Sequence, residues 1–350
     1  MTKSEKLRVG IFGVGHNHAA AAIGALRARE DVEIVGICEP DEEMLARRKK
    51  EHPDLYGDLP VTEEATLLSS GIRAAMVETS VPDLVPTALR CARAGLHIHM
   101  DKPAGTDLSL YRTLLGTAEE KHLVFGTGYM YRYNEGVTYA LSRIRSGALG
   151  RIYNVTAEMC TKHPAWYKNQ LIGYGVKAPV MFIFGGHLLD LCLRVKGEPE
   201  KLTAFHTASE DGGISFEDTS LAVLTYPDGI ATVRVSSCEV GGWGLREFTV
   251  YGERGTVRVS PLEAPMHVWE TMADGEDPWK DCHRDVKLAE AGRYDGMMRE
   301  FVDMCLGRIP YDVDFRHEAL LQKLTLEACG YSEREMLHPA EKTVGRGIDK

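Results

Sequence analysis

Two glycines close to the N-terminus carry the first chemistry that the sequence indicates. Gly13 and Gly15 lie between an apolar run at 7–12 and an Ala-rich helical run at 19–29. A glycine pair at such a junction permits a tight turn and lets the backbone approach a diphosphate, which then faces the N–H groups of the following helix. The pattern predicts a dinucleotide-binding turn, and the further cofactor contacts expected from it are His16, Asn17 and His18.

A carboxylate further along the chain favours NAD as the cofactor. Glu39 ends the second predicted strand, where it can accept hydrogen bonds from the ribose hydroxyls of the adenosine. The 2′-phosphate of NADP would be repelled by that carboxylate, so NADP is disfavoured. Thr79 and Ser80 end another strand and are expected to contact the nicotinamide half of the cofactor.

The pair His16 and His18 admits a second interpretation as metal ligands. Two imidazoles can contribute to a zinc site, but a complete site needs further ligands. Neither a carboxylate nor a cysteine lies near them in the sequence. We therefore expect no metal at this turn.

The elements that must position these residues follow a regular rhythm from Leu7 to about Thr127. Short β-branched runs alternate with Ala- and Leu-rich runs of helical spacing. This alternation predicts βαβ units and a doubly wound parallel sheet, a Rossmann domain at residues 1–128. The expected strands are 7–12, 33–38, 73–78, 96–100 and 123–126, and the expected helices are 19–29, 41–51, 83–94 and 107–121.

After Tyr129 the rhythm changes to strands in succession. One helical run near 135–146 precedes alternating runs, some of them joined by tight turns at 226–230 and 252–255. Successive strands predict an α+β domain at residues 129–350 with a mainly antiparallel, open-faced sheet. An apolar open face favours a homo-dimer or homo-tetramer. The expected strands are 151–160, 201–208, 217–226, 229–239, 245–251 and 255–260.

The overall composition excludes several kinds of partner. The formal net charge is -10, and the longest basic run, 47–50, lies among glutamates and is interpreted as a solvated helix face. Nucleic acid is therefore not an expected partner. No apolar run is long enough to span a membrane. The eight cysteines are spread singly, which is typical of free thiols in the cytoplasm.

The segment 96–103, which ends in Asp101-Lys102-Pro103, resembles the strand-ending Glu-Lys-Pro motif of the glucose-fructose oxidoreductase and inositol dehydrogenase family, Gfo/Idh/MocA. The resemblance continues in order through 128–134, 146–150 and 185–190. It implies a NAD(P)-dependent oxidoreductase that transfers a hydride between nicotinamide and a secondary alcohol of a sugar, an inositol-like polyol or a sugar derivative. By this resemblance Lys102 and Asp101 lie near the nicotinamide, and His187 is the general acid/base.

The sequence departs from the family pattern where the substrate should lie. The family commonly has an aspartate four residues before the catalytic histidine, but Ile183 stands there, after an apolar stretch at 177–182. His163 and Tyr131 are the first choices to replace that aspartate as hydrogen-bond partners. The candidates for substrate contact are Tyr131, Arg132, His163, Trp166 and Asp190.

Two other activities remain open on the sequence alone. In one, NAD is held tightly and oxidises the substrate only transiently, so that a neighbouring group is eliminated or hydrolysed. In the other, the chain is a NAD- or sugar-binding sensor without catalysis, which Ile183 favours. Lys102 and His187 together favour an enzyme, because a sensor has no evident need for both.

Overall fold

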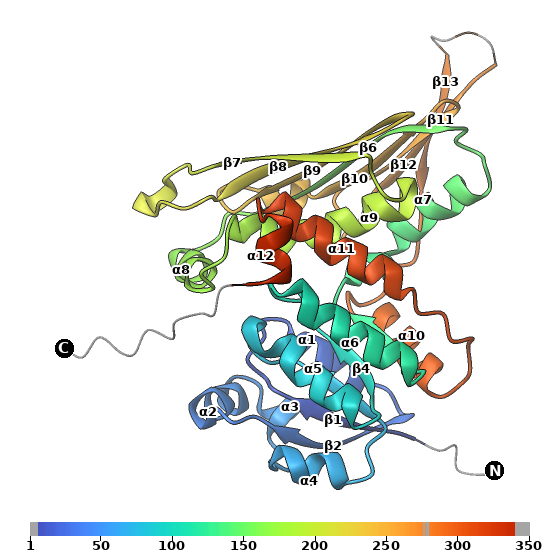
Figure 1. Ribbon diagram of the computed structural model, residues 1–350. Coiled ribbons are helices and arrows are strands. Elements are labelled where there is room, and N and C mark those ends of the chain that lie inside the picture. Colours follow the sequence, from blue (N-terminus) through green and yellow to red (C-terminus); the bar gives the residue numbers. More distant parts are fainter. Residues whose placement is uncertain (1–5, 276, 278–279, 340–350) are drawn as a thin grey trace.

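The computed structural model describes residues 6–275, 277 and 280–339. These residues form two stacked units, a small parallel sheet flanked by helices and a large, mainly antiparallel sheet (Figure 1). Helices α9 (Gly186–Lys196) and α11 (Phe315–Ala328) lie between the large sheet and the first unit. The predicted fold class, a Rossmann domain followed by an α+β domain, is confirmed.

The first sheet consists of five parallel strands in the order β2-β1-β3-β4-β5. All four residues of β3 are buried, which is why parallel strands of this kind are recognisable as short apolar runs. Two short helices escape prediction because they contain too few residues to show a period. The strands are β1 (Leu7–Phe12), β2 (Val32–Cys38), β3 (Ala74–Val77), β4 (His97–Met100) and β5 (Phe125–Thr127). The helices are α1 (Ala19–Arg27), α2 (Glu42–Glu51), α3 (Pro53–Tyr56), α4 (Glu64–Ser69), α5 (Leu84–Arg93) and α6 (Leu108–Glu120).

The second sheet has eight strands in the order β13-β12-β11-β10-β6-β9-β8-β7. The predicted mainly antiparallel sheet is confirmed, and its centre departs from that pattern, because β6 and β9 are parallel neighbours. The chain leaves β6 through two helices before it forms β7, and such a long connection permits a parallel pairing. The strands are β6 (Ile152–Cys160), β7 (Lys201–Thr207), β8 (Thr219–Tyr226), β9 (Gly229–Ser236), β10 (Glu247–Gly252), β11 (Gly255–Val259), β12 (Val268–Ala273) and β13 (Asp281–Val286).

One face of the second sheet is covered and the other is open (Figure 1). Helices α7 (Glu135–Arg145), α9 and α11 cover the first face. Along β8, buried and half-buried residues alternate strictly, as the period of two in a half-covered strand requires. The open face carries Phe205 and Ile230, with 58% and 46% of their surface exposed.

The C-terminal part of the chain returns to the first unit. Helix α10 (Asp295–Cys305) packs against α1, and α11 packs against α6. The ring of Phe301 lies 5.5 Å from that of His99, centroid to centroid. The predicted domain boundary between 128 and 129 falls in the loop after β5, and it stays a prediction because this returning segment joins the two units. Helices α8 (Ala165–Gly173) and α12 (Glu333–Leu337) complete the order.

Two findings concern membranes and thiols. Among the described residues, no helix has the length and apolar character needed to cross a membrane. All eight cysteines lie in the described part of the chain, and each is a free thiol.

Candidate active site

The predicted dinucleotide turn lies between β1 and α1, against the end of β3. Gly13 has a φ of +83°, and a Cβ atom there would lie 2.6 Å from the backbone of Thr79. A Cβ atom on Gly15 would lie 3.3 Å from the backbone nitrogen of Ser80. Side chains at these positions would strain the loop and crowd the space beside it. The fold thus brings together four of the residues predicted to bind the cofactor.

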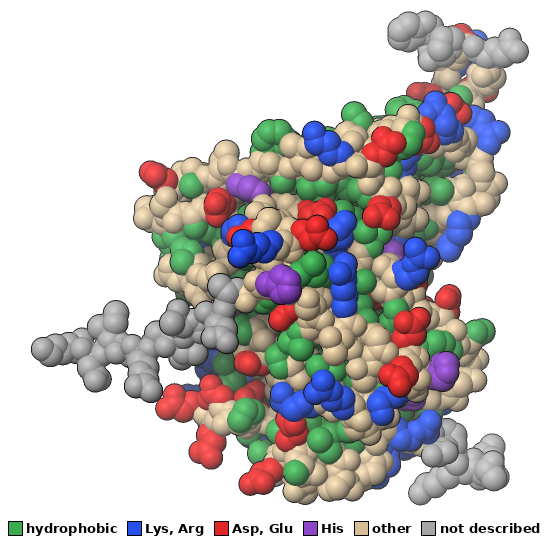
Figure 2. Space-filling view, viewed as in Figure 1, with side chains coloured by type: hydrophobic (Ala, Val, Ile, Leu, Met, Phe, Trp, Pro, Cys, Tyr) green, Lys and Arg blue, Asp and Glu red, His purple; other side chains and the backbone are tan. Residues whose placement is uncertain are grey.

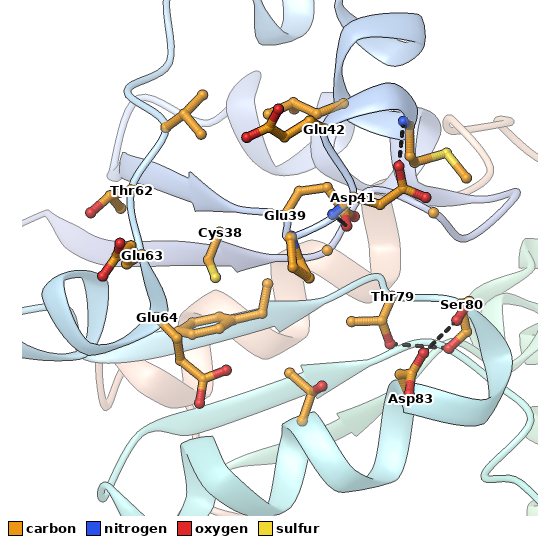
Figure 3. Close-up of a pocket in the computed structure, with 18 of the residues that line it drawn as sticks. Cys38, Glu39, Asp41, Glu42, Thr62, Glu63, Glu64, Thr79, Ser80 and Asp83 are labelled. Carbon is orange, nitrogen blue, oxygen red and sulfur yellow. Dashed lines mark hydrogen bonds between the residues drawn. The ribbon is translucent and has the colours of Figure 1, made fainter.

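A cavity of about 770 Å³ opens beside this loop (Figure 3). Its wall is acidic, with carboxylates from several segments, and acidic side chains also gather on the surface over α2 (Figure 2). Among the described lining residues the one arginine, Arg90, is held by Glu64 through hydrogen bonds of 2.7 and 2.9 Å. The acidic lining residues are Glu39, Asp41, Glu42, Glu63, Glu64 and Asp83.

Two charged side chains brace the turn from outside. Glu39 accepts hydrogen bonds from the backbone N–H groups of Val14, at 2.8 Å, and Asp41, at 3.0 Å. Arg48 donates to the carbonyl oxygens of Val14, at 3.0 Å, and His16, at 3.1 Å. The interpretation of 47–50 as a solvated face is therefore wrong for Arg48, whose side chain is only 14% exposed. A guanidinium that satisfies two carbonyls of the turn stabilises its shape.

Lys102 lies at the end of β4 and is buried, with 3% of its surface exposed. Its Nζ atom donates to the carbonyl oxygen of Ile183 over 2.9 Å. Burial lowers the pKa of Lys102 to about 8; the charge of Asp101 opposes this change, and Arg293 and Arg246 add to it. The ammonium is therefore charged at neutral pH but holds its proton less firmly than an exposed lysine.

A π-helical turn, Met181–Gly185, explains how Lys102 reaches the second unit. Such turns are short widenings of an α-helix and occur frequently at functional sites. Here the carbonyl oxygen of Ile183, within the turn, accepts a hydrogen bond from the lysine ammonium. The segment between residues 183 and 187 is therefore not one regular α-helical turn, because the helix is π-helical up to Gly185.

His187 follows this turn at the start of α9, with 1% of its surface exposed. Neither ring nitrogen has a hydrogen-bond partner among the described residues. The rings of Tyr129 and Tyr131 lie at 5.4 and 5.5 Å, centroid to centroid. Burial and the nearby Lys102 charge hold the pKa of His187 well below its usual value of 6.5. The ring is therefore a neutral, unpartnered base at neutral pH.

The remaining predicted cofactor residues lie around the same turn. Burial raises the pKa of Asp101, but its contacts with His16 and His18 outweigh burial and hold that pKa well below its usual range. Burial lowers the pKa of His18 to about 4. Asn17 points elsewhere, since its Nδ2 atom donates to Gln170 of α8 over 3.1 Å. Asn17 thus links the two units through its side chain and leaves only its backbone for the cofactor.

His163 lies in an aromatic stack beside the π-turn. Its ring is 4.6 Å from Tyr167 and 5.2 Å from Phe184, centroid to centroid. No described residue hydrogen-bonds its Nδ1 atom. Burial lowers the pKa of His163 to about 4, and the charges of Arg246 and Lys168 add to this effect. Trp166, another predicted substrate contact, is 66% exposed on α8.

The lowered pKa of His163 predicts how the free energy of unfolding changes at acidic pH. Because the folded-state pKa is about 4 and the ordinary value is 6.5, the unfolded chain takes up a proton first, and stability falls as the pH falls through this window. His163→Phe keeps the stack and removes the titration. We expect it to reduce the loss of unfolding free energy between pH 6.5 and 5 by up to about 2 kcal/mol, measured by urea denaturation. His283→Ala, an exposed histidine on β13, is the control, and an equal acid loss in both variants would contradict the prediction.

A cluster that sequence reasoning missed lies on the other side of His187. Tyr131 donates to Glu263 over 2.5 Å, and Arg246 pairs with the same carboxylate at 2.6 Å. Arg293 reaches it at 3.1 Å, and the Arg246 guanidinium lies 4.0 Å from the ring centre of Trp243. The Nε atoms of both arginines have no partner among the described residues. Two arginines against one glutamate leave this wall with a net positive charge.

Arg132 and Asp190 do not face this space as substrate contacts. Arg132 pairs with Asp190 at 2.9 Å and with Glu318 at 2.5 Å. Asp190 also accepts from His317 over 2.6 Å, and it is fully buried. Both side chains are thus occupied by an ion-pair network that joins α9 to α11. The expectation of a substrate role is not supported for either residue.

Fold and site together define a class of protein: a two-domain dinucleotide-binding enzyme with a buried lysine and an unpartnered histidine between its domains. The chain belongs to the Gfo/Idh/MocA family of oxidoreductases. Residues 7–129 match the description "Oxidoreductase family, NAD-binding Rossmann fold", and residues 137–258 match "GFO/IDH/MocA C-terminal domain". The resemblance predicted from the sequence is confirmed, and the first domain is an NAD-binding Rossmann domain.

Two curated relatives differ in how much of the chain they match. UDP-N-acetylglucosamine 3-dehydrogenase of Acidithiobacillus ferrooxidans is 23% identical over 311 residues, 88% of this chain and 91% of that protein. A glycosyl hydrolase family 109 protein of Stenotrophomonas maltophilia is 26% identical over 168 residues. That second match covers 44% of this chain and 36% of the relative, so it spans only about a third of the relative's length.

Two solved structures show the same architecture. A levoglucosan dehydrogenase in complex with NADH and levoglucosan has a TM-score of 0.77 at 16% identity, with 93% of this chain and 98% of that chain covered. The structure of the Acidithiobacillus ferrooxidans dehydrogenase has a TM-score of 0.75 at 20% identity, with 92% and 96% covered. At these identities the likeness establishes the fold.

Proposed function

We propose that the protein is a NAD-dependent dehydrogenase that oxidises a secondary alcohol of a sugar, a polyol or a sugar derivative. The observation that carries this proposal is the buried, unpartnered imidazole of His187, close to the buried ammonium of Lys102. A neutral base whose nitrogens have no partner costs stability and is typical of a catalytic position. The named activities of the relatives, on UDP-N-acetylglucosamine and levoglucosan, support a sugar-like substrate.

The glycine turn and its cavity fit a dinucleotide. A Cβ atom at Gly13 would collide with Thr79, so the turn has the close backbone approach that a diphosphate cradle needs. The residues that would hold the cofactor are the turn itself, Glu39 at the ribose, and Thr79 with Ser80 on the nicotinamide side. When bound, the nicotinamide supplies the acceptor for the hydride.

The chain's own residues supply the proton chemistry. The neutral ring of His187 accepts the hydroxyl proton of the substrate. The charged Lys102, fixed by the carbonyl of Ile183, stabilises negative charge on the substrate oxygen. His163, Tyr131 and the positive wall of Arg246 and Arg293 surround the space in which the substrate is held. Their aromatic faces and N–H donors suit a hydroxylated ring.

We propose NAD rather than NADP on the charge of the cavity. Six carboxylates line it, and the arginine among them is paired with Glu64. A 2′-phosphate placed near Glu39 would meet negative charge without a free cation to offset it.

Replacing Glu39 tests this preference. Glu39→Gln removes the charge and keeps the size, so we expect the ratio of the NADP and NAD dissociation constants to fall about tenfold, or about 1.4 kcal/mol. Fluorescence titration with both reduced cofactors measures it. Glu33→Gln is the control, because Glu33 pairs with Arg8 and does not line the cavity. An unchanged ratio would contradict the role given to Glu39.

The first experiment for the proposed activity follows nicotinamide reduction at neutral to alkaline pH. NAD and then NADP are offered with inositols, aldoses, methyl glycosides, sugar acids and nucleotide sugars. Turnover that depends on NAD and on His187 supports the proposal. Tight NAD binding without reduction by any of these alcohols would count against it.

A second candidate function rests on the relative named as a glycosyl hydrolase family 109 protein. In this alternative the cofactor returns to its starting state in each cycle, and a substituent next to the oxidised carbon is eliminated or hydrolysed. The protein would then purify with NAD bound and release the leaving group of a chromogenic glycoside without added cofactor. Net accumulation of NADH would instead favour the first candidate.

We propose a homo-dimer or homo-tetramer assembled through the open face of the second sheet. Phe205, Ile230 and half-buried residues of β8 make this face partly apolar, and large apolar patches are rare on monomers. Light scattering at micromolar concentration tests the assembly, and a monodisperse monomer would contradict it. The free thiols favour a reducing compartment, and we propose the cytoplasm.

A further inference from the structure

Three side chains beside the glycine turn converge on one point. The Nδ1 atoms of His16 and His18 each lie 3.2 Å from Oδ2 of Asp101. One ligand atom from each of the three residues lies within 4.8 Å of the other two. His16 is 7% exposed and Asp101 is fully buried. The histidines have no carboxylate near them in the sequence, but the fold brings Asp101 beside them, because β4 ends next to the turn.

Hydrogen bonds fix the tautomer of His16. Its Nε2 atom lies 3.1 Å from the carbonyl oxygen of Lys102, which can only accept, so Nε2 carries the hydrogen. The backbone N–H of His18 donates to Nδ1 over 3.2 Å, so Nδ1 carries a lone pair. The Asp101 carboxylate lies 3.2 Å from the same nitrogen, so an ion held by both groups would replace the hydrogen bond from the His18 N–H. Metal-binding histidines commonly donate their other N–H to a carbonyl in this way.

A second carboxylate lies behind the first. Glu78 is fully buried at the end of β3, and its carboxyl group lies within hydrogen-bond reach of that of Asp101. Its Oε2 atom is 3.9 Å from Nδ1 of His16. Two buried carboxylates at one place are costly without a compensating charge. Glu78 thus lies buried beside Asp101 and close to His16.

We propose that His16, His18 and Asp101 bind a divalent transition-metal ion, with zinc as the favoured ion and Glu78 as the adjacent carboxylate. Two imidazoles and a carboxylate are a common zinc ligand set. Tetrahedral bonds of about 2.0–2.1 Å place ligand atoms about 3.3 Å apart. Both histidine nitrogens lie 3.2 Å from Oδ2 of Asp101, close to this spacing, and Glu78 is farther away, at 3.9 Å from Nδ1 of His16.

The site has an entrance and a structural consequence. His18 lines an open hollow together with Asn17 and Arg293, through which an ion can reach the cluster. The ligands come from the glycine turn and the end of β4, with Glu78 at the end of β3, so the ion cross-links three loops of the cofactor site. The proposed proton transfer uses Lys102 and His187 and none of these side chains, so metal binding can be measured apart from turnover.

The experiment uses the full chain, dialysed against a chelator and then titrated with zinc or cobalt(II). We expect one metal equivalent per chain by elemental analysis, the visible absorption of a tetrahedral cobalt(II) centre, and a higher melting temperature with metal. His18→Ala and Asp101→Asn should each weaken binding at least about 100-fold, more than the usual cost of an outer-shell change. His283→Ala, on the exposed strand β13, should leave binding unchanged.

Two results would overturn the proposal. One is a wild-type chain that binds less than a tenth of an equivalent and whose melting temperature does not respond to metal. The other is equal binding by wild type and His18→Ala, which would place the metal elsewhere. Glu78→Gln is a further variant that keeps the shape of the cluster, so it is expected to fold. If its melting temperature equals that of the wild type without metal and does not rise when metal is added, the proposal is supported. An undiminished rise in its melting temperature with metal argues against the role given to Glu78.

Discussion

Lys102→Met should reduce turnover by about 10²- to 10³-fold while the dissociation constant of NAD changes little. The variant keeps the volume of the side chain and removes the charge that faces the substrate oxygen. The expected size is that of losing one preorganised donor to a developing negative charge. The loss should appear in kcat, because the charge is needed more in the transition state than for binding. Steady-state kinetics on an alcohol found in the panel, with NAD affinity measured separately, checks this expectation.

The control for Lys102 is Lys177→Met. Lys177 is an exposed lysine that pairs with Glu335, so its loss should leave turnover unchanged. The alternative for Lys102 is a purely structural role, since its ammonium also satisfies the carbonyl of Ile183. A structural lysine would lower the melting temperature and the NAD affinity together with turnover. Near-normal turnover in Lys102→Met would remove the electrostatic role altogether.

The fold was predictable wherever a short stretch of sequence decides it. The inner strands β1 and β3 are buried almost throughout, so each is a compact apolar run close to its predicted range. The parallel pairing of β6 and β9 depends on a connection that local patterns do not describe. The outer strand β13 was missed because its residues, Asp281–Val286, are polar and exposed and give no alternation.

The residues of the candidate site likewise differ in whether the sequence alone predicts them. Gly13, Gly15 and Lys102 belong to local motifs, and the sequence places them on the turn and strand end where they lie. Arg246 and Glu263 carry no motif and meet Tyr131 only through contacts between residues more than 100 positions apart. Single arginines are common on surfaces, so no sequence signal marks these as buried. The same limit hid the contact between Asp190 and His317 of α11.

The π-turn shows why a lost family residue need not mean a lost activity. An aspartate four residues before His187 would orient the ring only if that segment were a regular helix. In this chain Ile183 contributes its backbone carbonyl, which positions Lys102, and His187 is left between the rings of Tyr129 and Tyr131. Ring packing restricts the orientation of the imidazole, while a carboxylate partner would also raise its pKa. The site therefore favours a base that stays neutral.

His187→Leu should lose turnover by about 10²- to 10⁴-fold, the usual contribution of a general base. Its melting temperature should stay the same or rise, because the wild-type ring leaves two buried nitrogens without partners, a cost of about 1–3 kcal/mol for each unsatisfied group. A residue kept for packing or hydrogen bonding would show the opposite sign. Thermal unfolding and steady-state kinetics on the same preparation measure both effects.

The matched control is His99→Leu, since His99 is also fully buried and also lacks partners for both nitrogens. That variant should gain stability and keep turnover, because the ring of His99 packs on Phe301 away from the substrate space.

The pH dependence of turnover separates the two histidines further. Because the pKa of His187 lies well below 6.5, its base form persists as the pH falls from 8 to 6.5, so kcat should not decline there through this group. A decline of kcat with an apparent pKa near 6.5 that disappears in His187→Leu would show that the ring of His187 is exposed to water during turnover. That result would contradict the assignment of His187 as a buried neutral base.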